Sequence, residues 1–205
     1  DSENEDSEMI FYSPTISVEI DNDDDFAFET EISYSSLTQD NKECQYGIVW
    51  GSESKNMAAS KRYIFDISIA GFFNIYEYGE DGYTSLSDDW QESKWINKEE
   101  NSTNYLAVVK VENEYTFYIN DHDVYTLDAK KMPFFGKYAG FYMASWGNHE
   151  FSADYFATWK IIDDREATPN IQYSDNEIDT EYQPQQEING KIELLYDSFN
   201  DDEVN

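Results

Sequence analysis

The fold of this chain is decided between residues 105 and 127, which read YLAVVKVENEYTFYINDHDVYTL. Side chains suited to a buried face recur at every second position, at Tyr115, Phe117 and Ile119. A helix would repeat its apolar positions every three or four residues, so a period of two predicts β-strands. Asn120 and Asp121 supply turn chemistry, and the stretch therefore predicts three short strands joined by two tight turns. Such a meander is not stable alone, so partner strands must come from elsewhere in the chain.

Further stretches of the chain show the same alternation. They are FAFETEISY (26–34), RYIFDISIAG (62–71), MPFFGKYAGFYMASW (132–146) and DYFATWKII (154–162). Aromatic residues make up 17% of the 205 residues, which favours sheets over helices. About ten strands with short loops and no helical pattern are typical of a two-sheet sandwich. We therefore predict an all-β, antiparallel β-sandwich in one domain, with acidic, extended N- and C-terminal segments.

The formal net charge is −31, and it is concentrated at the two ends of the chain. Residues 1–25 hold ten acids and no base, and residues 163–205 hold thirteen acids and two bases. Nucleic acid and anionic membranes would be repelled, so neither is an expected partner. No apolar run approaches the roughly 18 residues that a membrane span requires, so we expect no membrane insertion. Because the sequence starts at Asp1 instead of Met, we expect a processed, exported chain that is extracellular or at the cell surface.

Two short stretches carry a resemblance to known domains. They are YGIVWG at residues 46–51 and the YIN turn at residues 118–120. With the strands around them, they form a series over roughly residues 12–162 that resembles the concanavalin-A-like and laminin-G-like jelly-roll domains of bacterial surface and multidomain proteins. The resemblance implies a β-sandwich with an extracellular or modular binding role. Relatives bind glycans or proteins, hydrolyse polysaccharides or space other domains, so the resemblance names no ligand.

The domains that this chain resembles usually open with a strand of the form D-x-F-x-D, which its N-terminus lacks. Residues 189–205, NGKIELLYDSFNDDEVN, look like that missing strand. We therefore expect four segments: an acidic arm at residues 1–11, the sandwich at 12–162, a polar acidic linker at 163–190 and a C-terminal strand at 191–205.

Three uses of this C-terminal strand are open. It can complete its own sandwich, it can complete the sheet of a neighbouring copy, or it can begin a following tandem domain. We favour donation to a neighbour, which would make the chain a non-catalytic subunit that assembles with itself, head to tail, into a filament or surface layer. The expected assembly residues are Ile192, Leu194, Tyr196 and Phe199.

The alternative function is a monomeric, lectin-like adhesion module that binds glycans or other surface proteins. The loop between residues 84 and 103 contains Trp90 and Trp95, whose rings are the best candidates for stacking on sugars. Asn101, Ser102 and Thr103 form an acceptor triplet, so Asn101 is a possible glycosylation site in a eukaryotic secretory setting.

A third alternative is a laminarinase-type glycoside hydrolase, because Glu177, Asp179 and Glu181 resemble the E-x-D-x-E motif of those enzymes. The motif belongs on a central strand with much of the domain after it, whereas only 24 residues follow Glu181. We therefore expect no enzymatic activity.

Asp21, Asp23 and Asp25 form an acidic cluster that we expect to bind Ca²⁺ weakly at most. Phe26 and Ile32 replace the Gly and the Glu that an EF-hand loop requires. Apart from this possible Ca²⁺, no cofactor is expected.

Overall fold

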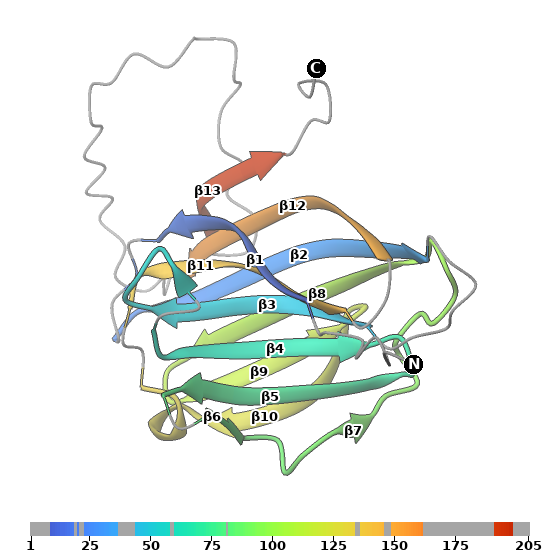
Figure 1. The fold of residues 1–205 in the computed structure, drawn as a ribbon. Coiled ribbons are helices and arrows are strands. Elements are labelled where there is room, and N and C mark those ends of the chain that lie inside the picture. Colours follow the sequence, from blue (N-terminus) through green and yellow to red (C-terminus); the bar gives the residue numbers. More distant parts are fainter. Residues whose placement is uncertain are drawn as a thin grey trace, which may run out of the picture.

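The computed structural model describes residues 9–18, 20, 23–36, 44–57, 60–80, 82–133, 136–145, 149–161 and 191–198. Over these residues the chain forms two antiparallel sheets packed face to face, shown in Figure 1. The predicted all-β sandwich is therefore confirmed. A short 3-10 turn, η2 (Ala129–Lys131), connects β10 to β11.

Sheet A lies toward the viewer in Figure 1. Among the described residues its order is β1 (Met9–Ser17), β11 (Tyr138–Ser145), β3 (Cys44–Ser52), β4 (Arg62–Ser68), β5 (Phe72–Gly79) and β6 (Gly82–Ser85). The two-residue strand β7 (Gln91–Glu92) also pairs with β5. Three consecutive strands, β3 to β5, thus form the middle of the sheet.

Sheet B lies behind sheet A. Its order is β10 (His122–Asp128), β9 (Glu114–Ile119), β8 (Thr103–Val111), β2 (Asp25–Ser36), β12 (His149–Ile161) and β13 (Lys191–Ser198). The predicted meander is confirmed as β8, β9 and β10. Its second turn uses Asn120 and Asp121 at φ 49° and 65°, the left-handed region that Asn and Asp tolerate better than most residues.

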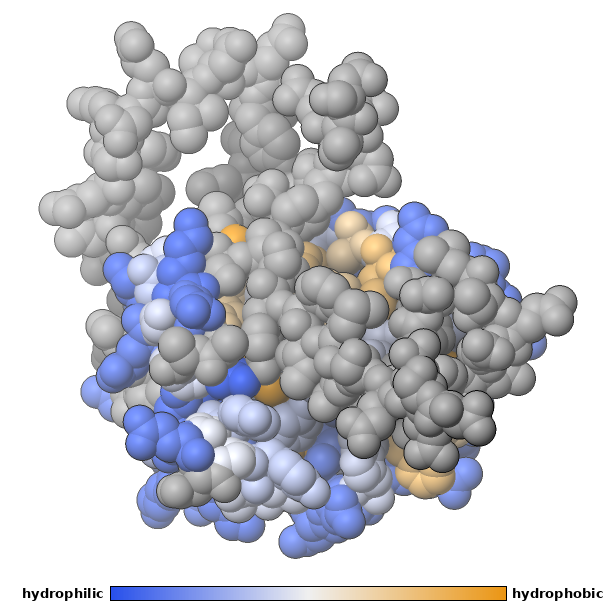
Figure 2. All heavy atoms as spheres, in the orientation of Figure 1, coloured by the Kyte–Doolittle hydropathy of each residue, from blue (hydrophilic) through white to orange (hydrophobic). Residues whose placement is uncertain are grey.

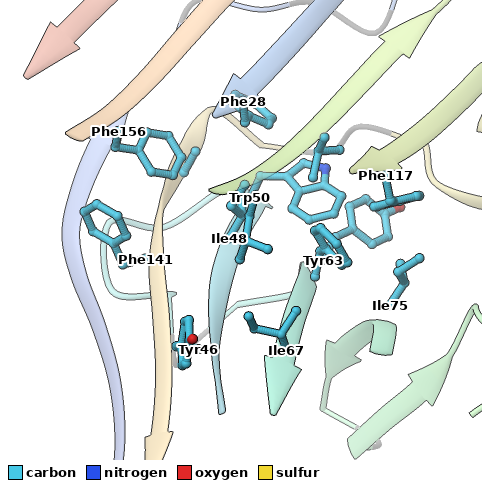
Figure 3. Packing of buried hydrophobic residues seen from close by; sticks show 14 of the residues in the cluster. Phe28, Tyr46, Ile48, Trp50, Tyr63, Ile67, Ile75, Phe117, Phe141 and Phe156 are labelled. Carbon is cyan, nitrogen blue, oxygen red and sulfur yellow. The ribbon is translucent and has the colours of Figure 1, made fainter. Parts of the chain in front are cut away.

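The core between the sheets is built from alternate residues of the strands of both sheets. Trp50 of β3 lies at its centre, with ring centroids 5.7 Å from Tyr63, 6.3 Å from Phe28 and 6.3 Å from Phe117 (Figure 3). Cys44, the only cysteine, is fully buried in the same core, and burial raises the pKa of its thiol to about 12. Close packing of large rings holds the two layers together.

Gly47 allows β3 and β4 to approach closely. A Cβ atom on Gly47 would lie 2.0 Å from the carbonyl oxygen of Phe65 and 2.7 Å from the Cα of Asp66. Both are backbone atoms, so a side chain at this position could not be accommodated without moving a strand. Gly47 is also the cross-strand partner of Asp66, so β3 places no side chain beside this carboxyl group.

The C-terminal strand β13 pairs with β12 of the same chain, at the edge of sheet B (Figure 1). The register runs from Ser198 opposite Tyr155 to Lys191 opposite Ile161. In this single chain the backbone of β13 pairs with its own sandwich, and donation to a neighbouring copy and the start of a following domain stay predictions. The side chains of Ile192, Leu194 and Tyr196, and all of Phe199, lie outside the described residues, so their expected contacts are not placed.

Candidate functional site

The outer face of sheet A, which points away from the core, carries a group of tyrosines. Alternation along each strand buries residues such as Phe65 and Ile75 and turns their neighbours outward. The outward tyrosines are Tyr76 and Tyr78 of β5, Tyr83 of β6, and Tyr138 and Tyr142 of β11, and we call them the tyrosine face. Figure 2 views this side and shows spheres of intermediate hydropathy gathered on its lower part.

The rings of the tyrosine face pack edge to face. The centroid of Tyr76 lies 6.0 Å from that of Tyr83 and 6.3 Å from that of Tyr142, with interplanar angles of 76° and 83°. The Arg62 guanidinium lies over the Tyr78 ring, 4.3 Å from its centroid. Tyr83 is the most open of the group, with 65% of its surface exposed. Tyr76 and Tyr142 are themselves buried and Tyr78 and Tyr138 are half-buried, so the group presents mainly the Tyr83 ring to solvent.

Asp66 of β4 belongs to the same outer face but is fully buried. The Tyr76 hydroxyl donates to Asp66 Oδ2 at 3.1 Å, whereas Oδ1 has no hydrogen-bond partner in the described structure. Burial raises the pKa of the Asp66 carboxyl to about 8, and the Tyr76 hydrogen bond offsets part of that rise. Asp66 is therefore predominantly protonated at neutral pH, which avoids an uncompensated charge beneath the rings.

Asn74 of β5, opposite Asp66 in the register, anchors the loop that follows β6. Its Oδ1 accepts hydrogen bonds from Ser85 at 3.0 Å and Ser87 at 2.8 Å. Ser87 in turn accepts a hydrogen bond from the Ile75 amide at 3.0 Å, and the Asp89 amide donates to Ser85 Oγ at 2.8 Å. These bonds fix polar groups beside the exposed ring of Tyr83.

Trp95, one of the two predicted sugar-stacking tryptophans, lies apart from the tyrosine face. Trp95 stacks on His122 with centroids 3.4 Å apart, and Lys94 Nζ lies 4.4 Å from the Trp95 centroid. Asn120 of the β9–β10 turn donates to the Trp95 carbonyl at 2.7 Å, so Trp95 belongs to that end of the sandwich. A sugar would compete with His122 and Lys94 for its ring. Trp90 is half-buried just before β7. Sugar stacking by either ring stays a prediction.

Other predicted residues fall partly outside the described chain. Asn101 is exposed, with φ 64°, and glycosylation there stays a prediction. Asp21 is outside the described residues. Asp25 Oδ1 accepts a hydrogen bond from the Glu112 amide at 2.6 Å and lies 3.9 Å from Lys110 Nζ, so this carboxylate already has two partners.

No group of three His, Cys, Asp or Glu side chains that could hold a metal ion occurs within the described residues. The motif acids Glu177, Asp179 and Glu181 lie between residues 162 and 190, which the structure does not describe. No helix in the described part of the chain is long and apolar enough to cross a membrane.

Sequence reasoning missed the tyrosine face and Asp66. One available signal was Asp66 itself, an acid inside the apolar strand YIFDISI. An acid at such a position must either reach solvent or be buried with its pKa shifted.

No family model and no curated protein matches this chain. Similar solved structures include the carbohydrate-binding module CBM66 from Bacillus subtilis, with a TM-score of 0.48 and 12% identity over 73% of this chain and 80% of that one. Sheep galectin-11 in complex with glycerol has a TM-score of 0.47 and 10% sequence identity, over 68% of this chain and 96% of the galectin. A glycoside hydrolase family 16 endo-glucanase from Bacteroides ovatus has a TM-score of 0.44 and 12% sequence identity, over 60% of this chain and 56% of the enzyme. These likenesses are of fold alone, and the two-sheet antiparallel sandwich itself is given by the strand order of this chain.

Proposed function

We propose that this chain is a non-catalytic carbohydrate-binding module that holds a glycan on the tyrosine face. The observation that carries the proposal is the exposed Tyr83 ring, packed on the buried Tyr76, with the half-buried Ser85 on the same face of β6. Sugar rings present C–H faces that stack on aromatic rings and hydroxyls that need polar partners. The Tyr83 ring offers the first, and the half-buried Ser85 hydroxyl, which the buried Asn74 holds in place, offers the second.

The ligand expected from the charge of the chain is an uncharged glycan. At a net charge of −31, the protein repels uronic acids and sulfated sugars. Asp66 adds no charge to the face at neutral pH because its carboxyl is protonated. Because glycans of this kind are met on cell surfaces and in the extracellular matrix, we place the working location of the module there.

Head-to-tail assembly, the first expectation from the sequence, is not carried forward. β13 already occupies the free edge of β12 in its own chain, which is the edge that a donated strand would fill. The glycan-binding alternative needs no second copy and uses side chains that the structure describes.

The test is binding of neutral polysaccharides and their oligosaccharides, measured by calorimetry with the full chain and with Tyr83→Ala. Loss of one stacking ring costs roughly 0.5–1.5 kcal/mol, so we expect the affinity to fall about two- to twelvefold. The matched control is Tyr118→Ala, which removes a tyrosine from the outer side of sheet B. Equal losses in both variants, or no binding to any neutral glycan, would refute the proposal.

A further inference from the structure

The outer face of sheet B differs in character from the tyrosine face. Among its described side chains, the outward positions of β2, β8, β9, β10 and β12 include acids and aromatic rings but no Lys, Arg or His. The acids are Asp25, Glu29, Glu31, Glu114, Asp123, Asp128 and Glu150. The aromatic residues are Tyr105, Tyr118, Tyr155 and Trp159. The nearby lysines, Lys110 and Lys160, reach instead to Asp24 and Asp25 at one end of the strands.

Glu29 lies at the centre of this face and is held in place by aromatic side chains. Trp159 Nε1 donates to Glu29 Oε2 at 3.1 Å, and Tyr105 shares a side-chain hydrogen bond with the same carboxylate. The cross-strand neighbours of Glu29 are Ala157 and Ala107, which bring no bulk beside it. The result is a fixed carboxylate between an indole and a phenol.

The charged side chains that act on Tyr105, those of Glu29 and Asp121, are both acids. Burial raises the pKa of Tyr105 well above its ordinary value, and the negative charge of Glu29 and the proximity of Tyr155 and Asp121 raise it further. A phenol resists ionisation in this way where nearby charges are negative. A positive ligand would be stabilised at the same place.

We propose that the outer face of sheet B docks a lysine-rich segment of a partner protein, with an ammonium group against Glu29 between Trp159 and Tyr105. A carboxylate with aromatic rings beside it matches an ammonium ion by charge and by cation–π attraction. The match extends to the whole chain, whose 44 acids and 13 bases attract a basic partner from a distance. This interaction is separate from glycan binding, because it uses the opposite side of the sandwich.

A divalent cation fits this face less well than an ammonium group. Glu29 already accepts two hydrogen bonds, and its cross-strand neighbours on β12 and β8 are alanines that offer no further ligand. Calcium requires six or more oxygen ligands. An ammonium group needs only one carboxylate with aromatic side chains beside it.

The experiment uses the full chain and a fluorescent peptide of about ten lysines, long enough to cross five strands spaced roughly 4.8 Å apart. Fluorescence anisotropy at about 0.15 M salt, where long-range attraction is largely screened, gives the affinity. Glu29→Gln keeps the shape of the side chain and its acceptor oxygen but removes the charge, so we expect binding to weaken by about tenfold. The matched control is Glu53→Gln, the same change at an exposed position after β3, with an expected effect under about twofold.

Two further results decide the proposal. Tetramethylammonium should compete with the peptide on the unchanged protein, because the site recognises the ammonium group itself. Glycan affinity should be the same in Glu29→Gln as in the parent chain. Equal weakening in the two variants would show attraction by net charge alone and overturn the proposal, as would no binding of the peptide.

Discussion

At the scale of single residues, Asp66 departs furthest from its ordinary chemistry. It lies on the outer side of a sheet, yet it is fully buried and its pKa is raised to about 8. Its hydrogen bond to Tyr76 links it to the ring on which Tyr83 packs. The protonation of the Asp66 carboxyl is therefore linked, through its hydrogen bond to Tyr76, to the packing of Tyr76 against Tyr83.

Asp66 should make the folded state less stable as the pH rises. In the unfolded chain the carboxyl loses its proton near pH 4, whereas in the folded chain it keeps the proton to about pH 8. Its contribution to stability is therefore fully present below about pH 4 and is lost as the pH rises to about 8. Replacing Asp66 with Asn removes this dependence.

We expect the melting temperature of the parent chain to fall relative to that of Asp66→Asn between pH 5 and pH 8.5. The expected change in the difference is at least about 3 °C, equivalent to roughly 1 kcal/mol for a domain of this size. Thermal unfolding followed by circular dichroism gives both curves. Since other carboxyls titrate equally in the two proteins, parallel curves would mean that Asp66 is ionised in the fold at neutral pH.

At the scale of elements, β13 shows what local sequence can and cannot specify. Its apolar content and turn-free sequence identify it as a strand, but its partner is set by an edge that more than 30 positions separate from it along the chain. In contrast, β8, β9 and β10 follow one another through tight turns, so the sequence predicts their pairing directly.

Deleting β13 should leave the protein monomeric but less stable. A chain ending at Gly190 exposes the edge of β12, and we expect the free energy of unfolding to fall by roughly 1–3 kcal/mol. Urea denaturation measures this loss, and light scattering measures the mass. A chain ending at Ser198, which keeps β13, is the control and should match the full chain. Large species that depend on residues 191–198 would instead support strand donation between copies.

The tyrosine face illustrates a second limit of sequence reasoning. A period of two identifies the two faces of β5 and β11, but Tyr suits either a core or a surface, so the pattern alone does not say which face points outward. Tyr46, Tyr63 and Tyr115 are in the core, whereas Tyr76, Tyr78 and Tyr83 are on the outer face. The sequence pattern predicted the sheets, but choosing the face required the cross-strand register.

At the scale of the whole molecule, charge is the dominant property. The chain has 44 acids against 13 bases, so most carboxylates have no base in the chain with which to pair. Ion pairs such as that between Lys160 and Asp24, at 2.6 Å, neutralise only a few of these acids. The folded state therefore holds many like charges close together, which lowers its stability at low ionic strength.

Salt should stabilise the protein. Screening shortens the Debye length from about 20 Å near 0.02 M salt to about 4 Å near 0.5 M, so repulsion between carboxylates weakens. We expect the melting temperature to rise by about 3 °C or more over this range. Potassium chloride at equal ionic strength is the control and should act as sodium chloride does. An unchanged melting temperature would contradict repulsion as a cost to the fold, and a rise with sodium alone would indicate bound sodium ions.

The single cysteine has a consequence for following the motions of the sandwich. Cys44 is fully buried at the first position of β3, with its thiol kept protonated, so a thiol reagent cannot react with it while the two layers are closed. Alkylation in native buffer has to wait for this end of β3 to open. The half-time of labelling therefore measures the rate of that opening. Because Cys44 is the only cysteine in the sequence, no other thiol contributes to the signal.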